Sequence, residues 1–77
     1  MRTALKKFAN AQEVILKDND QFKAGWEYCS NSHLLRKLKT EVAELELALI
    51  DGDKENIKYE CCDVANYAMM LFDNQEE

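Results

Sequence analysis

Proline is absent from this 77-residue sequence, and glycine occurs only twice. Both residues supply the tight turns that join short strands, so a small β-sheet fold is disfavoured. With 47% hydrophobic and 32% charged residues, the composition is instead typical of a small helical domain. No repeat, low-complexity tract or linker interrupts the sequence, and we therefore expect one all-α domain over residues 1–77.

A long apolar run is also missing. The longest stretch with few charges, residues 61–72, is interrupted by Asp63 and Asn66 and is far shorter than the roughly 20 residues that a membrane span needs. The basic residues near the N-terminus are not followed by an apolar block, so they are not expected to form a signal peptide. We expect a cytoplasmic protein with no membrane partner.

Basic residues are scarce relative to acidic ones, ten against fifteen, which gives a formal net charge of -5. This balance argues against nucleic acid as a partner, because nucleic-acid binding favours clustered lysine and arginine. The three cysteines are an odd number, and neighbouring Cys61 and Cys62 point to different faces of a helix, which disfavours disulfides. A chain this short buries only about 60% of its unfolded surface, so we expect oligomerisation to supplement the core.

Periodicity predicts the first of three helices over about residues 2–17. Its apolar side chains gather near one face, and these are Leu5, Phe8, Ala9, Ile15 and Leu16, with Gln12 among them. Residues 21–31 show no clear period, so we predict a connecting loop that packs through Phe22 and Trp26.

The second and third helices are predicted over about residues 33–50 and 54–73, as an antiparallel hairpin. Ser30, Asn31 and Ser32 are candidate N-caps for the second helix, while Gly52 suits a left-handed turn and Asp53 caps the third helix. The expected core stripes are Leu35, Leu38, Val42, Leu45 and Leu49 on one helix and Ile57, Cys61, Val64, Ala68 and Leu71 on the other.

Each helix of this hairpin carries a pair of acids beside its apolar stripe. Glu41 and Glu44 lie one turn apart on the second helix, and Glu60 and Asp63 repeat the arrangement on the third. An aspartate in so apolar a helix costs several kcal/mol unless it is paired, hydrogen-bonded or metal-bound. Four carboxylates that converge across the hairpin repel one another strongly without a cation, and all-oxygen ligation suits Mg²⁺ or Mn²⁺.

An alternative interpretation of these acids is an ordinary solvated surface, because acid pairs at this spacing are common on exposed helices. Two such pairs on consecutive helices, each beside a core stripe, are much less frequent by chance. The pattern alone therefore leaves a metal site and a surface charge cluster about equally favoured.

The two acid pairs also resemble a known family. Glu41-x-x-Glu44, fifteen intervening residues and Glu60-x-x-Asp63 are similar to the signature of the MazG-like all-α nucleoside triphosphate pyrophosphohydrolases. Residues 38–45 resemble the first metal helix of that superfamily, and residues 60–67 resemble the second. The segment through Gly25 and the ending of residues 68–74 are similar to a short phage or bacterial MazG-like branch.

This resemblance implies hydrolysis of a (d)NTP between its α and β phosphates, to a monophosphate and pyrophosphate, with Mg²⁺ (or Mn²⁺) as cofactor. By position, it makes Glu41, Glu44, Glu60 and Asp63 both the metal ligands and the catalytic residues. It also implies a dimer or tetramer. A second apolar patch on the second helix, Ala43, Leu47 and Ile50, is a candidate interface that would complete a helical bundle.

Four further residues are candidates for substrate binding, each with a structural alternative. Asn66 lies one turn beyond Asp63 and either contacts substrate or supports the ligands. Lys37 either touches phosphate or pairs with Glu41, and Lys23 in the loop leaves the same choice open. Trp26 either contacts a ligand or covers a small core.

The runner-up function belongs to a different class. In this alternative the chain is a non-catalytic helical oligomerisation module, or a regulatory module that binds nucleotide without hydrolysing it. The acids are then structural, and no metal-dependent stabilisation is expected.

Overall fold

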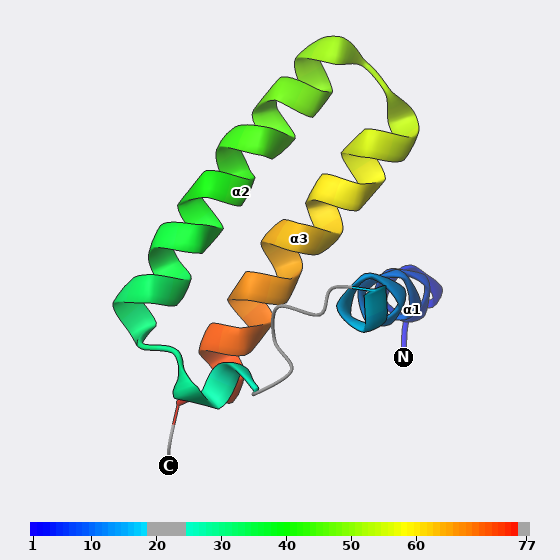
Figure 1. Ribbon diagram of the computed structural model, residues 1–77. Helices are drawn as coiled ribbons and strands as arrows, with labels where there is room; N and C mark the ends of the chain where they lie inside the picture. The colour runs from blue at the N-terminus through cyan, green and yellow to red at the C-terminus, as the bar shows by residue number, and fades with distance from the viewer. Residues whose placement is uncertain (19–24, 76–77) are drawn as a thin grey trace.

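The computed structural model describes residues 1–18 and 25–75. Within these ranges the chain forms three α-helices, α1 (Thr3–Asp18), α2 (Asn31–Asp51) and α3 (Lys54–Asp73), and one short 3-10 helix, η2 (Trp26–Tyr28). Helices α2 and α3 lie side by side as an antiparallel pair, with α1 set apart beside α3 (Figure 1). The predicted all-α fold and its hairpin are confirmed.

The hairpin begins and turns at the capping residues that the sequence predicts. The Ser30 hydroxyl accepts a hydrogen bond from the His33 N–H at 3.1 Å, which satisfies a free donor at the start of α2. Gly52 ends α2 in the left-handed conformation, with φ of 75°. One Asp53 carboxylate oxygen then accepts from the N–H groups of Glu55 and Asn56, at 3.1 and 3.3 Å.

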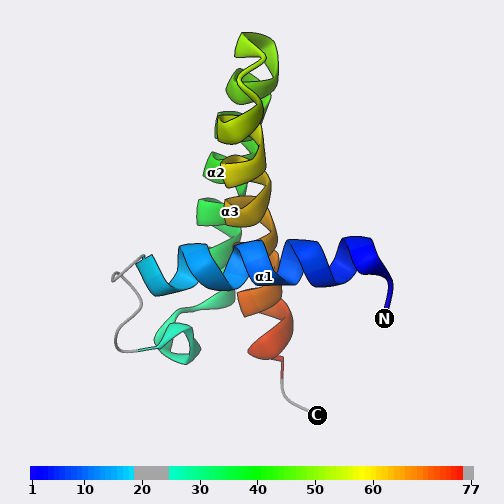
Figure 2. The ribbon, with the colours of Figure 1, turned by 90° about the vertical axis from the view of Figure 1, so that its right-hand side faces the viewer.

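Helix α1 crosses α3 at a steep angle, on the side of α3 away from α2 (Figure 2). None of its residues is buried. Of its apolar face, Ile15 and Leu16 are half-buried, whereas Leu5 and Phe8 are exposed. The predicted apolar face of the first helix is therefore covered only toward its C-terminal end.

The core is small and lies where the N-terminal part of α2 meets the C-terminal part of α3. Leu34, Tyr67 and Met70 form its buried centre. Half-buried side chains surround them, and these are Leu16, Trp26, Cys29, Leu38, Met69 and Leu71. The segment through η2 closes this end, because the Trp26 indole N–H donates to Asp73 at 3.0 Å.

The predicted core stripe of α2 is wrong in part. Leu38 and Leu45 are half-buried, but Leu35, Val42 and Leu49 are 44%, 49% and 58% exposed. A strict seven-residue repeat drifts around a helix of 3.6 residues per turn. The side that meets α3 is therefore offset from the leucine repeat, and its fully buried members are Leu34 and Ala48.

The predicted core stripe of α3 is also wrong in part. Ile57, Cys61, Val64 and Leu71 are half-buried, and Leu71 packs against the core, but Ala68 is exposed. The fully buried positions of α3 are Cys62, Asn66, Tyr67 and Met70. Helix α3 packs mainly against α2 and α1, in different directions, and also contacts η2. Its burial is divided between these two directions and does not follow a single stripe.

Two residues named from the sequence cannot be placed in the structure. Phe22 was expected to pack in the connecting loop, and Lys23 to contact substrate, but both lie outside the described residues. No helix in the described ranges is long and apolar enough to cross a membrane.

Candidate functional site

Three of the four predicted carboxylates meet between α2 and α3. Glu41 comes from α2, and Glu60 and Asp63 come from successive turns of α3. One oxygen of each carboxylate lies within 4.8 Å of the others, and all three side chains are half-buried. We call these three residues the acid triad. The hairpin turn and the one-turn spacing on α3 are together sufficient to bring them to one place.

One oxygen of the acid triad has no partner. Glu60 Oε1 is buried, and nothing in the part of the chain that the structure describes donates a hydrogen bond to it. A buried polar atom without a partner costs about 1–3 kcal/mol, and more when it carries charge. The folded chain therefore holds an acceptor that an additional positive group would satisfy.

Proximity and burial raise two pKa values in the acid triad. Burial, followed by the charges of Asp63 and Glu60, raises the pKa of Glu41 to about 7. Burial and the charge of Glu60 raise the pKa of Asp63 to about 6. Both shifts record that negative charge is disfavoured at this position until a cation or a proton compensates it.

Glu44 stands apart from the acid triad. Its side chain is exposed, and the described group of converging carboxylates contains only the other three acids. Its charge nevertheless contributes to the raised pKa of Glu41, after the effects of burial, Asp63 and Glu60. Glu44 is therefore an acid at the edge of the site, within electrostatic reach of Glu41.

Asn66 is buried but turns toward α1. The Gln12 side-chain amide donates to Asn66 Oδ1 at 2.9 Å, and Asn66 Nδ2 donates to the Gln12 carbonyl oxygen at 3.4 Å. Both polar atoms of Asn66 are thus engaged by one residue of α1. This contact fits the supporting role that the sequence left open, because it fixes α1 one turn away from Asp63.

Within residues 1–18 and 25–75, no contact brings Trp26 or Lys37 to the acid triad. Trp26 packs against the core and bonds Asp73, which fits its structural alternative. Lys37 is exposed on α2, one turn before Glu41. The structure leaves a phosphate contact by Lys37 as a prediction.

Sequence reasoning missed two neighbours of the site. Gln12 was placed only as a member of an apolar face, although a lone amide at such a position signals a polar partner across the interface. Tyr59 was not considered, yet the charge of Asp63, burial and the charge of Glu60 all raise the pKa of its hydroxyl. The available signal was its position directly before Glu60.

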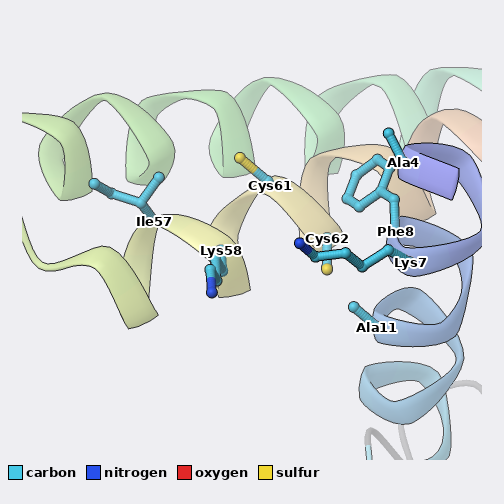
Figure 3. A pocket seen from close by; sticks show the side chains of 8 residues that line it. All are labelled: Ala4, Lys7, Phe8, Ala11, Ile57, Lys58, Cys61 and Cys62. Atoms are coloured by element: carbon cyan, nitrogen blue, oxygen red, sulfur yellow. The ribbon is translucent and has the colours of Figure 1, made fainter.

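A separate groove of about 390 Å³ lies between α1 and α3. Its lining is mostly apolar and contains none of the predicted site residues; it consists of Ala4, Lys7, Phe8, Ala11, Ile57, Lys58, Cys61 and Cys62. Figure 3 shows Lys7 extending from α1 toward Cys62 on α3. The groove reflects the incomplete cover that α1 gives to α3.

The acid triad fits a hard divalent cation. Its donors are all carboxylate oxygens, they come from two rigid helices, and one of them is buried without a partner. The raised pKa of Glu41 shows that burial and the neighbouring acids disfavour the ionised form of this carboxyl. A set of oxygen donors suits Mg²⁺ or Mn²⁺ better than a metal that prefers sulfur or imidazole.

Comparison with known proteins gives one match. A family model described as phosphoribosyl-ATP pyrophosphohydrolase matches residues 8–76, which include all of α2 and α3 and therefore the complete acid triad. Searches of curated proteins and of solved structures give no match.

Proposed function

Because the chain belongs to the phosphoribosyl-ATP pyrophosphohydrolase family, within the MazG-like all-α superfamily, we propose that it is a divalent-metal-dependent nucleoside triphosphate pyrophosphohydrolase. The family supports a pyrophosphohydrolase activity on nucleotides. Our proposal adds a (d)NTP substrate that is cleaved between the α and β phosphates, Mg²⁺ (or Mn²⁺) as cofactor, and membership of the short phage or bacterial MazG-like branch.

The acid triad is the observation that carries this proposal. Glu41, Glu60 and Asp63 would hold the cation, and Glu60 Oε1 is the buried acceptor that it would satisfy. When bound, a divalent cation neutralises phosphate oxygens and lowers the pKa of a water molecule. The residues of this chain contribute a set of half-buried carboxylate oxygens from two helices.

Protons and cations compete for the same oxygens. Since burial and neighbouring charges raise the pKa of Glu41 to about 7, this carboxyl keeps its proton in mildly acidic solution and releases it near neutrality. Cation binding, which needs the ionised form, should therefore strengthen as the pH rises through 7. Glu44, exposed at the edge of the site, would then be the acid best placed to orient a water molecule or a further cation.

The direct test measures pyrophosphate release from a panel of canonical and modified (d)NTPs in the presence of Mg²⁺. We expect Glu41→Gln and Asp63→Asn each to reduce the rate by about 1,000-fold, the scale on which removing a group that stabilises developing charge acts. Glu46→Gln is the matched control, because Glu46 is an exposed acid on the same helix and outside the acid triad. Activity that survives both triad substitutions would refute the assignment.

A calorimetric titration separates hydrolysis from binding. Heat of Mg²⁺-dependent nucleotide binding without pyrophosphate release, lost in Glu60→Gln, would point to the regulatory alternative. If neither metal nor nucleotide binds, and the melting temperature is the same with and without Mg²⁺, the structural-module alternative is supported.

A further inference from the structure

The groove between α1 and α3 has the size of a small-molecule site. Its volume of about 390 Å³ falls within the range of ligand pockets, about 300–1,000 Å³. Phe8 of α1 and Ile57 of α3 supply apolar surface, and Cys61 and the buried Cys62 add the thiols of α3. Phe8 is still 36% exposed, so the two helices leave apolar surface here that a ligand could cover.

This groove and the acid triad lie on opposite sides of the same turn of α3. Successive residues of a helix advance by about 100°, so Cys61 and Cys62 point away from the side that Glu60 and Asp63 share. The acids face α2, whereas the two cysteines line the groove beside α1. A ligand in the groove is therefore separate from a ligand of the acid triad.

Two lysines, one from each helix, border the groove. Lys7 belongs to α1 and Lys58 to α3, and Figure 3 shows Lys7 reaching from α1 toward α3. Both side chains are exposed, and neither forms an ion pair with the part of the chain that the structure describes. The eight lining residues include no acid. The lining thus carries two positive charges and no negative charge.

The positive charge extends along the half of α1 that borders the groove. Residues 1–12 contain Arg2, Lys6 and Lys7 and no acid, in a chain whose net charge is -5. The basic part of this acidic protein therefore coincides with its apolar groove. A negatively charged ligand that the acid triad repels would be attracted to this region.

The combination of apolar walls and two amines defines the chemistry of a ligand. A hydrocarbon tail gains free energy with each methylene that the walls cover, and a carboxylate accepts charge-assisted hydrogen bonds from ammonium groups. A lysine amine is a point charge on a flexible stem, so two of them can converge on one carboxylate. A small hydrophilic anion would leave the walls uncovered, and an uncharged hydrocarbon would leave the lysines without a partner.

We propose that the groove binds a fatty carboxylate, with its tail against Phe8 and Ile57 and its carboxylate between Lys7 and Lys58. Such a ligand contacts both helices, so it holds α1 against α3. Helix α1 contributes no buried residue of its own, and it is the element that gains most from this contact. The site does not depend on the proposed pyrophosphohydrolase activity.

An NMR titration of the full chain with decanoate, kept below its micelle concentration, tests the two parts of the ligand. We expect saturable shifts at the groove residues with decanoate, but not with acetate, which lacks the tail, or with decyltrimethylammonium, which has the opposite charge. Lys7→Gln and Lys58→Gln should each weaken decanoate binding by about fivefold, because each removes one exposed ion pair. Lys17→Gln is the matched control, since Lys17 is an exposed lysine of α1 outside the groove lining.

A groove-filling variant tests where the tail lies. Ala11→Leu places a larger side chain in the groove and should weaken decanoate binding by about 10-fold or more, because methylenes of the tail are displaced. Circular dichroism establishes that each variant stays helical. In hydrogen exchange, decanoate should slow the amides of wild-type α1, since a ligand that binds both helices opposes their separation.

Three results would overturn the proposal. The first is decanoate binding that does not saturate, or that shifts residues throughout the chain, which is the behaviour of a detergent. The second is equal binding of decanoate and decyltrimethylammonium, which would show that the lysines do not select the charge. The third is decanoate binding that stays at the wild-type level in both lysine variants and in Ala11→Leu.

Discussion

Helix α3 has polar residues at its interfaces with both α1 and α2. The residue that faces α1 has hydrogen-bond partners, whereas an oxygen that faces α2 has none. Toward α1, Asn66 is almost fully buried and both of its polar atoms have a partner in Gln12. Toward α2, Glu60 has a buried oxygen without a partner, and its nearest polar neighbours carry the same charge. The first arrangement lowers the energy of the folded chain by itself, whereas the second raises it.

This difference separates polar groups that hold the fold from those that await a ligand. A buried polar group with complete hydrogen bonding needs no further explanation. A group of half-buried acids, in which the pKa values of Glu41 and Asp63 are raised, needs a compensating charge, and perturbed pKa values of this kind cluster at functional sites. Both kinds of residue appear in the same helix within two turns, so their mutations should be distinguishable in one background.

The largest expected effect is on activity, through Glu60→Gln. Removing one charge from the acid triad should reduce Mg²⁺-dependent pyrophosphate release by about 1,000-fold, because a carboxylate ligand is lost. In a metal chelator the same variant should unfold at an equal or higher temperature, since repulsion within the triad is relieved. Parallel rate and thermal-melt measurements check both halves. A variant that loses activity and stability together would place Glu60 with the structural group.

The next effect is on stability, through Asn66→Ala. It should lower the free energy of unfolding by about 1–3 kcal/mol, because it leaves the Gln12 amide without its partner. Urea unfolding measures the loss. A double-mutant cycle with Gln12→Ala supplies the control, and we expect the double variant to cost less than the sum of the two single variants. Additive effects would show that the two side chains do not interact.

A smaller effect is the pH dependence of stability without metal. Glu41 keeps its proton up to about pH 7 when folded but only to its ordinary pKa of 4.5 when unfolded, so the folded chain binds more protons in that window. Stability should therefore be highest below pH 4.5 and fall as the pH rises to 7, by on the order of 1 kcal/mol after allowing for solvent screening of this partly exposed group.

Thermal melts in chelator at about pH 5 and about pH 8 measure this slope. Glu41→Gln should flatten it, and added Mg²⁺ should reverse it by stabilising the ionised triad. The exposed Glu46→Gln should leave the slope as in wild type. A melting temperature that rises with pH in chelator would contradict the strain assigned to the acid triad.

The smallest effect is expected for Trp26→Phe. It removes the 3.0 Å hydrogen bond to Asp73 but keeps an aromatic ring against the core. The loss should be about 0.5–1.5 kcal/mol in urea unfolding, with nucleotide hydrolysis unchanged. A drop in activity at constant stability would instead restore Trp26 as a substrate contact.

Local signals in the sequence were sufficient for the helices and for most of the site. The bounds of α3 agree with the prediction, and Ser30, Gly52 and Asp53 act as predicted, because capping depends on residues close in the chain. The hairpin and the one-turn acid spacing bring Glu41, Glu60 and Asp63 together for the same reason. Their roles in metal binding and catalysis stay predictions.

Side-chain environments that depend on distant partners could not be predicted. The leucine repeat of α2 was assigned to the core, but Leu35, Val42 and Leu49 are exposed because α3 meets α2 on an adjacent side. Asn66 is bonded to Gln12, which is distant in sequence and follows no period that relates the two. Periodicity identifies an apolar side of a helix but not which neighbour, if any, covers it.

The steep crossing of α1 over α3 has a consequence for how the molecule opens. Helix α1 contributes no fully buried residue, and it is held mainly by the Gln12–Asn66 contact and by Leu16 against the core. Such an element can detach as a unit with little loss of buried apolar area, while the capped hairpin stays intact. In native-state hydrogen exchange, the amides of α1 should therefore exchange together through a sub-global opening, well before those at the centre of α3.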